Sequence, residues 1–253
     1  MFETEAEFPS GVVLVAHGLN NKPEVMDSLI GVLLAEGFHC LRIGLHRDVG
    51  KHTAPAAIVN GWMDTLTHAH RKIVDEYGAY PIYSLGYSLG AVVTMRFLEV
   101  CPRATFRKMV LIAPPVALTR VASLVRFLTP LARFGIVLPS AAPREVRARW
   151  GTPLSEYAAM LELADALRTL HRKDKLRGIP TEIVLDPDDE LVSYAGVLAW
   201  LERQQLEEWT AHRLQDRAPT GRTYAHLMVL EASLGSLAWA NMTERVINHF
   251  KML

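Results

Sequence analysis

The chain has 253 residues, half of them apolar, which is enough to bury one large core. Its 27 Lys and Arg balance its 27 Asp and Glu, so no overall charge draws it to nucleic acid, and we expect no such partner. The two cysteines form neither a disulfide framework nor the spacing of a metal site, and we expect no metal. The first residues, MFETEAEFPSG, lack the basic and apolar regions of a secretory signal, and no eighteen consecutive residues are apolar. We therefore expect a soluble, cytoplasmic protein with a single domain over residues 1–253.

Six short apolar runs have the composition of strands that are covered on both faces. They span residues 11–16, 38–43, 81–85, 109–113, 181–185 and 209–214. Amphipathic segments with helical spacing separate or follow them, over residues 23–36, 54–77, 89–100, 193–208 and 236–250. This alternation predicts an α/β fold with a mostly parallel sheet, helices on both faces, and ligands at the carboxyl ends of the strands.

The segment over residues 114–175 does not alternate in this way. It shows helical and turn patterns without a convincing strand, and strand character returns only at residue 181. We expect a helical cap at about residues 114–175 that lies over the strand ends. The alternative is a pair of ordinary helices that cover the sheet.

The motif Gly86-Tyr87-Ser88-Leu89-Gly90 joins the third predicted strand to the helix predicted after it. A strand, a sharp turn and a helix in this order are the context of a nucleophile elbow, whose turn raises a serine hydroxyl above the sheet. A Cβ at Gly86 or Gly90 would collide with the neighbouring backbone, and Ser88 is expected to be strained. The alternative is a serine that only caps the following helix.

A serine hydroxyl becomes a good nucleophile when a base takes its proton, so a carboxylate and a histidine must follow in the order Ser, Asp, His. Asp189 follows the predicted strand at 181–185, where a turn can point a carboxylate toward Ser88. His226 follows the last predicted strand and a polar loop, and of the ten histidines only it lies past the acid at the mouth of a loop. Three other acids of the same turn compete with Asp189 for its role: Asp186, Asp188 and Glu190.

Attack on an ester carbonyl develops an oxyanion, which needs preorganised N–H donors. His17-Gly18-Leu19 comes directly after the first predicted strand, and Gly18 would let the backbone turn so that the N–H of Leu19 faces the site. The N–H of Leu89, next to the nucleophile, would be the second donor. We expect His17 to brace this loop through a hydrogen bond and assign it no catalytic step.

With these motifs the sequence resembles the α/β-hydrolase superfamily, in particular its compact, capped esterases and its monoacylglycerol-lipase-like members. The resemblance rests on VVLVAHGLN, YSLGYSLGA, EIVLDPDDELVS and YAHLMVL, in that order, and it spans nearly the whole chain except the cap. It implies a triad and two oxyanion donors without a metal or an organic cofactor. The residues that it implies for these roles are Ser88, Asp189 and His226, and Leu19 and Leu89.

Two positions depart from the resemblance. Asp186 stands where these enzymes often have glycine, and Ala225 replaces the glycine usual before the histidine. Both departures leave the residue types of the triad unchanged, but they put the geometry of the two loops in question.

These features predict hydrolysis of a carboxylic ester, with a short to medium acyl chain or a monoacylglycerol-like substrate, through an acyl-enzyme. A thioesterase, an acyltransferase that excludes water and an amidase use the same machinery. An alternative of another class is a protein that binds a small apolar ligand in this pocket without turnover. The sequence leaves the oligomeric state open.

The region over residues 120–149 is basic. It holds one acid, Glu145, and six arginines, for a local balance of 6 − 1 = +5: Arg120, Arg126, Arg133, Arg144, Arg147 and Arg149. Pro130 must break or kink the helix after Thr129, but the residues before and after it share one apolar face: Val121, Leu124, Val125, Leu128 and Leu131. We expect this face to line an acyl pocket. Weak contact of the basic cap with a lipid surface is a further hypothesis, and a solvated basic face is its alternative.

Overall fold

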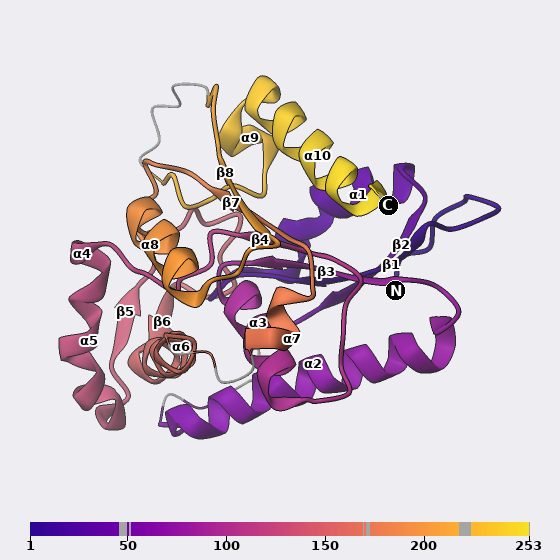
Figure 1. Cartoon of the computed structure of the whole chain (residues 1–253). Helices are drawn as coiled ribbons and strands as arrows, with labels where there is room; N and C mark the ends of the chain where they lie inside the picture. Colours follow the sequence, from indigo (N-terminus) through magenta and orange to yellow (C-terminus); the bar gives the residue numbers. More distant parts are fainter. Residues whose placement is uncertain (46–49, 51, 169, 171–172, 218–223, 253) are drawn as a thin grey trace.

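A six-stranded parallel sheet lies at the centre of the computed structural model, which describes residues 1–45, 50, 52–168, 170, 173–217 and 224–252 (Figure 1). The strands are β1 Gly11–Ala16, β2 Phe38–Ile43, β3 Ile82–Tyr87, β4 Met109–Ile112, β7 Thr181–Leu185 and β8 Trp209–Arg213. Their order is β2-β1-β3-β4-β7-β8, and each neighbouring pair is parallel. The predicted α/β fold is confirmed, and all six predicted runs are strands.

The strand order reverses direction between β1 and β3. The chain places β2 on one side of β1 and then places β3, β4, β7 and β8 on the other. The loops that leave β1 and β3 therefore diverge at their carboxyl ends, where open α/β sheets form a crevice for ligands. Apolar side chains hold this centre in place, since residues 12–16 of β1 have no exposed surface.

Helices cover both faces of the sheet, with α1 and α10 on one side and α2 and α3 on the other (Figure 1). Their bounds are η1 Pro23–Met26, α1 Asp27–Ala35, α2 Pro55–Tyr77, α3 Leu89–Val100, α8 Tyr194–Gln204, α9 Glu231–Leu234 and α10 Ser236–Lys251. α8 ends a turn earlier than predicted because Gln205 adopts a left-handed conformation and its N–H bonds to the carbonyl of Glu202. No helix in the described part of the chain combines the length and the apolar character needed to cross a bilayer.

Between β4 and β7 the chain forms a mixed insertion. Its elements are α4 Arg120–Ser123, α5 Val125–Leu128, η2 Thr129–Phe134, β5 Val137–Pro139, β6 Gly151–Pro153, α6 Leu154–Ala166 and α7 Lys173–Arg177. The expectation of no strand here was wrong, because β5 and β6 pair antiparallel. Each has three residues, too few for a two-residue alternation to show in the sequence. The α-helix ends at Leu128 and tightens into η2 around Pro130, as the proline predicts.

The insertion has two parts with different packing. α6 packs against α2 and α3, two helices that cover one face of the sheet. α4 and α5 stand together at the left of Figure 1, and α5 packs against α6. The cap at about residues 114–175 and its alternative, a pair of ordinary sheet-covering helices, stay predictions.

Candidate active site

Ser88 lies at the sharp turn between β3 and α3. Its backbone has φ 50° and ψ −114°, a strained conformation for a residue with a Cβ. A Cβ at Gly86 would lie 2.8 Å from the Cα of Ala91, and one at Gly90 would lie 2.3 Å from the carbonyl oxygen of Ala16. Strand and helix are thus pressed together as an elbow requires. The Ser88 side chain makes no capping bond to the described helix α3, so the alternative of a simple helix cap is wrong.

The structure brings the hydroxyl, the imidazole and the carboxylate together. The Nε2 atom of His226 lies 2.9 Å from the Oγ atom of Ser88, and its Nδ1 atom lies 2.8 Å from Oδ2 of Asp189. A carboxylate only accepts, so Nδ1 carries the hydrogen and Nε2 is left to accept the Ser88 proton. All three residues are buried, which strengthens the electrostatic interactions among them.

Backbone amides orient the Asp189 carboxylate. Its Oδ1 atom accepts hydrogen bonds from the N–H groups of Leu191 at 2.8 Å and Val192 at 2.9 Å. The other oxygen is thereby directed at the imidazole. Of the four acids that compete for this role in the sequence, Asp189 is the one whose carboxylate contacts the imidazole of His226 in the described structure.

The other three acids of this turn have different surroundings. Asp188 is exposed, and its N–H donates to Oδ1 of Asp186 at 2.9 Å. Asp186 forms a partly buried ion pair with Arg217, and Glu190 accepts hydrogen bonds from the backbone that carries His226. Sequence reasoning missed the parts played by Arg217 and Glu190, because only the folded chain brings them beside the histidine. Within the described ranges, no three side chains of His, Cys, Asp or Glu gather as a metal site requires.

Tyr87, the residue before the nucleophile, contacts the histidine from the elbow. Its hydroxyl donates to the carbonyl oxygen of His226 at 3.0 Å, and the two rings lie 5.4 Å apart. Burial raises the pKa of Tyr87 well above its usual value, and the nearby groups Tyr224, Asp189 and Glu190 raise it further. The hydroxyl therefore stays protonated and keeps its role as a donor.

The loop after β1 approaches the nucleophile closely. Gly18 does not have the positive φ that favours glycine, and its role in turning the Leu19 N–H toward the site stays a prediction. The absence of a side chain at Gly18 leaves room for the nucleophile, since a Cβ there would lie 3.2 Å from the Cβ of Ser88. His17 accepts the Leu45 N–H at Nε2 (2.9 Å) and has Nδ1 2.8 Å from the carbonyl of Gly18, contacts that brace the loop.

The two expected oxyanion donors flank this approach. Leu19 lines the cavity that also contains Ser88 and His226. Leu89 is the first residue of α3, where the backbone N–H groups have no partner inside the helix and carry the positive end of its dipole. The N–H of Gly90 donates to the carbonyl of His17 at 3.1 Å and ties the β1 loop to this helix end.

A cavity of about 570 Å³ opens onto Ser88 and His226. Its walls are mostly apolar and come largely from the insertion, including four residues of the predicted acyl-binding face: Val121, Leu124, Val125 and Leu128. Leu131, also expected there, is not part of the lining, because the change to a 3₁₀ helix alters the spacing of side chains around the axis. Burial raises the pKa of Tyr157 and of Tyr224, so these two lining phenols remain neutral.

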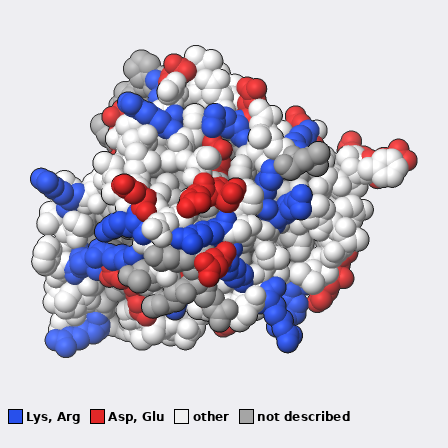
Figure 2. Space-filling view, in the orientation of Figure 1, with Lys and Arg blue, Asp and Glu red and all other residues white. Residues whose placement is uncertain are grey.

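The basic character of the insertion is weaker than the sequence count suggests. Arg126 pairs with Asp165, and Arg149 pairs with Glu156 at 2.6 Å. Both acids belong to α6, beyond the counted range, so the fold brings them back against the arginines. Figure 2 shows the face of the molecule that is seen in Figure 1, and on it positive and negative side chains are interspersed.

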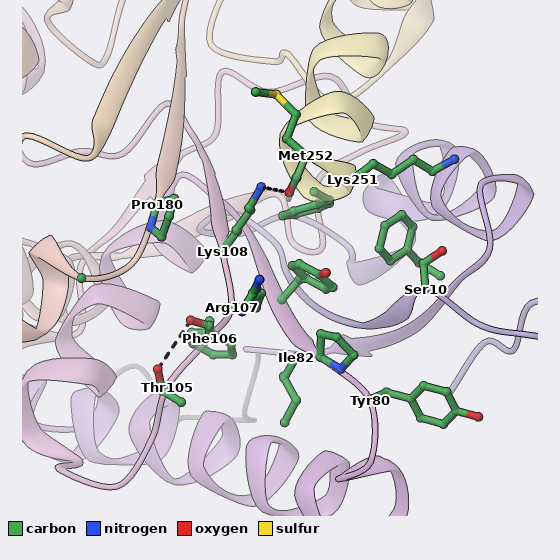
Figure 3. Close-up of a pocket in the computed structure, with 15 residues that line it drawn as sticks. Ser10, Tyr80, Ile82, Thr105, Phe106, Arg107, Lys108, Pro180, Lys251 and Met252 are labelled. Atoms are coloured by element: carbon green, nitrogen blue, oxygen red, sulfur yellow. Dashed lines mark hydrogen bonds between the residues drawn. The ribbon is translucent and has the colours of Figure 1, made fainter.

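A larger cavity of about 950 Å³ lies away from this site, at the end of the sheet where the strands begin (Figure 3). Lys108 reaches across it to donate to the carbonyl of His249 at 2.7 Å and to that of Met252, at the end of α10. The described lining contains no histidine and no acid, so it offers no base beside a nucleophile. The contacts among Ser88, His226 and Asp189 lie at the smaller cavity.

Comparison with known proteins agrees with this architecture. Residues 7–152, more than half of the chain, match the family model described as serine aminopeptidase, S33. None of the curated proteins compared with the sequence matches it.

Solved structures of low sequence identity share the fold. A soluble variant of monoglyceride lipase from Saccharomyces cerevisiae, in complex with a substrate analog, is 10% identical with a TM-score of 0.72, over 99% of this chain and 89% of that one. A monoacylglycerol lipase from Paleococcus ferrophilus is 16% identical with a TM-score of 0.67, over 98% and 97%. An esterase from Pyrococcus furiosus is 19% identical with a TM-score of 0.60, over 99% and 88%. The predicted resemblance is confirmed, and the chain belongs to the serine aminopeptidase S33 family of α/β-hydrolases.

Proposed function

We propose that the protein hydrolyses a carboxylic ester through an acyl-enzyme, with Ser88 as nucleophile, His226 as general base and Asp189 as the acid that orients the histidine. The observation that carries this proposal is the unbroken contact chain from Oγ of Ser88 through both nitrogens of His226 to Asp189, at 2.9 and 2.8 Å. An alcohol, a base and an orienting acid in this relation are what acyl transfer needs.

In the proposed reaction, Ser88 Oγ attacks the ester carbonyl while Nε2 of His226 takes its proton. The N–H groups of Leu19 and Leu89 bind the resulting oxyanion, and Asp189 stabilises the imidazolium. The imidazolium then gives its proton to the leaving alcohol, and the acyl group remains on Ser88. His226 next removes a proton from water, whose oxygen attacks the carbonyl of the acyl-enzyme. The imidazolium then returns this proton to Oγ of Ser88 as the bond between Oγ and the acyl group breaks, and the acid is released.

The cavity favours an ester with an apolar acyl chain, of medium length or monoacylglycerol-like. Val121, Leu124 and Val125 supply the apolar wall that such a chain would contact, and residues 114–175 act as its cap. An aminopeptidase, by contrast, must bind the ammonium group of its substrate, and the described lining of this cavity has no acid for that purpose. Two of the structural neighbours are monoglyceride lipases.

The test uses purified protein, p-nitrophenyl esters from acetate to octanoate, matched thioesters and amides, and a fluorophosphonate probe. We expect ester hydrolysis that rises with chain length, and labelling at Ser88 that is lost in Ser88→Ala and in His226→Ala. Activity that stays flat or falls with chain length would contradict the acyl pocket. Folded protein that is neither labelled nor active would favour the alternative of a ligand-binding protein.

We also propose weak contact between the mouth of this cavity and an anionic lipid surface. Val121 and Phe127 line the cavity, yet they are 76% and 77% exposed, so apolar surface continues from the pocket to the outside. Arg120 and Arg133 lie on the same segment and match the charge of anionic headgroups. An amphiphile could then enter the pocket directly from the lipid.

Liposome flotation, with and without anionic lipid, tests this contact. We expect binding to anionic liposomes that falls in the double variant Val121→Ser, Phe127→Ser. Phe8→Ser is the control, because Phe8 is 83% exposed but does not line the cavity. Equal absence of binding to both kinds of liposome would contradict the proposal.

A further inference from the structure

The segment that carries His226 is irregular, with no helix or strand over residues 224–230. An imidazole that must meet Ser88 on one side and Asp189 on the other has to be held within about half an ångström of its working position. Tyr87 holds the carbonyl of His226, as described above. Two further side chains hold the same short segment from other directions.

Glu190 holds the N–H side of this segment. Its Oε2 atom accepts the N–H of Ala225 at 2.9 Å and the N–H of His226 at 3.2 Å. Glu190 directly follows Asp189, so the orienting acid and the backbone of the histidine are fixed to one turn. Hydrogen bonds from backbone N–H groups to a carboxylate are stronger than those to a neutral acceptor, which suits a positioning contact.

Arg217 holds the carbonyl side. Its Nη1 atom donates to the carbonyl of Ala225 at 2.7 Å, and its Nη2 atom donates to those of Tyr224 at 3.3 Å and Ser233 at 3.2 Å. Nη1 also donates to the Asp186 carboxylate. Arg217 therefore makes four hydrogen bonds, as many as its Nη atoms have hydrogens. They join Asp186, in the turn after β7, to backbone carbonyls that come before and after His226 in the chain.

The ion pair between Arg217 and Asp186 is shielded from water, with the two side chains 18% and 4% exposed. Desolvation makes such a pair a weak source of stability, so its value lies more in the geometry that it imposes. Asp186 and Ala225 are also the two positions at which the sequence departs from the resemblance. Asp186 takes part in these contacts through its carboxylate, whereas Ala225 takes part only through its backbone, as a glycine would, so the contacts account for the first departure and not for the second.

We propose that Glu190 and Arg217, supported by Asp186, are positioning residues that hold His226 between Ser88 and Asp189. This inference rests on the hydrolase reaction proposed above. Neither side chain lines the cavity. Their loss should therefore slow proton transfer while leaving the binding of substrate nearly unchanged.

The experiment compares Glu190→Ala, Glu190→Gln and Arg217→Met with the wild type on a soluble p-nitrophenyl ester. We expect kcat to fall about 100-fold in Glu190→Ala and Arg217→Met, since a displacement of the histidine by about 1 Å is enough for such a loss. KM should change little, and labelling of Ser88 by the fluorophosphonate should slow in parallel with kcat. Glu190→Gln should keep most of the activity, because its amide oxygen can accept the same two N–H groups. Arg213→Met is the control, as Arg213 is exposed on β8.

Circular dichroism and thermal unfolding show which variants are folded at the assay temperature. A merely structural role predicts a lower Tm with an unchanged kcat for the folded protein, and this result would overturn the inference. If Arg217→Met does not fold, the comparison of Glu190→Ala with Glu190→Gln decides, and equal kcat values in these two would overturn it. Wild-type protein without esterase activity or Ser88 labelling would instead overturn the proposed function itself.

Discussion

The carboxyl end of the sheet, called the sheet edge below, lies beneath the cavity, and the insertion lies above it. These two regions hold their side chains in different ways. At the sheet edge, Ser88, Asp189 and His226 are each less than one-tenth exposed and are joined by hydrogen bonds. In the insertion, Val121 and Phe127 are more than three-quarters exposed. The helices that carry them, α4 and α5, have four residues each and are too short to be stable without tertiary contacts.

The two regions meet different requirements of the proposed reaction. Proton transfer needs atoms at fixed distances, which buried and hydrogen-bonded side chains provide. An apolar wall for an acyl chain needs only volume and apolar surface, which many side chains can supply. Substitutions at the sheet edge should therefore change the rate, whereas substitutions in the insertion should change the choice of substrate.

The largest effect is expected at the acid of the triad. Asp189→Asn should lower kcat by about 10⁴-fold, as the equivalent change does in serine proteases, because an amide stabilises the wrong tautomer of His226. Steady-state hydrolysis of a p-nitrophenyl ester measures it. Asp188→Asn is the control, since Asp188 is exposed in the same turn. Equal rates in the two variants would remove Asp189 from the proposed triad.

An intermediate effect is expected at the elbow. Gly90→Ala should lower the free energy of unfolding by about 1–3 kcal/mol, because the new Cβ would overlap the backbone of Ala16. Gly31→Ala is the control within α1, where a Cβ meets nothing within 4 Å. It should instead raise stability by up to about 1 kcal/mol, through helix propensity. Denaturant unfolding measures both, and equal shifts would refute the tight packing of the elbow.

The smallest effect is expected in the insertion. Val125→Trp should fill part of the cavity and shift the preference between octanoate and acetate esters toward acetate by about tenfold, with little change in kcat for acetate. The ratio of kcat/KM for the two esters measures it. Val74→Trp is the control, because Val74 is exposed on α2 outside the cavity. A loss of activity on both esters alike would mean that the insertion also governs the rate.

Much of the sheet and the elbow could be predicted from local sequence. Runs such as residues 11–16 are apolar enough to identify central strands, and Gly86 and Gly90 mark the turn that only glycine can fit. Short elements escaped prediction, as β5 and β6 show, because three residues hold too little periodic signal. The end of α8 escaped it as well, since a left-handed Gln205 has no distinctive sequence signature.

The sequence by itself determined the fold class, the order of the motifs and the residue types available for acyl transfer. Only the tertiary structure decided which of four acids contacts the imidazole of His226, which acids pair with Arg126 and Arg149, and that Arg217 and Glu190 bond to the backbone beside the histidine. The physical reason is separation along the chain. Hydrophobic periodicity acts over a few residues, whereas His226 lies 37 positions from Asp189 and 138 positions from Ser88, and only the packed sheet brings them together.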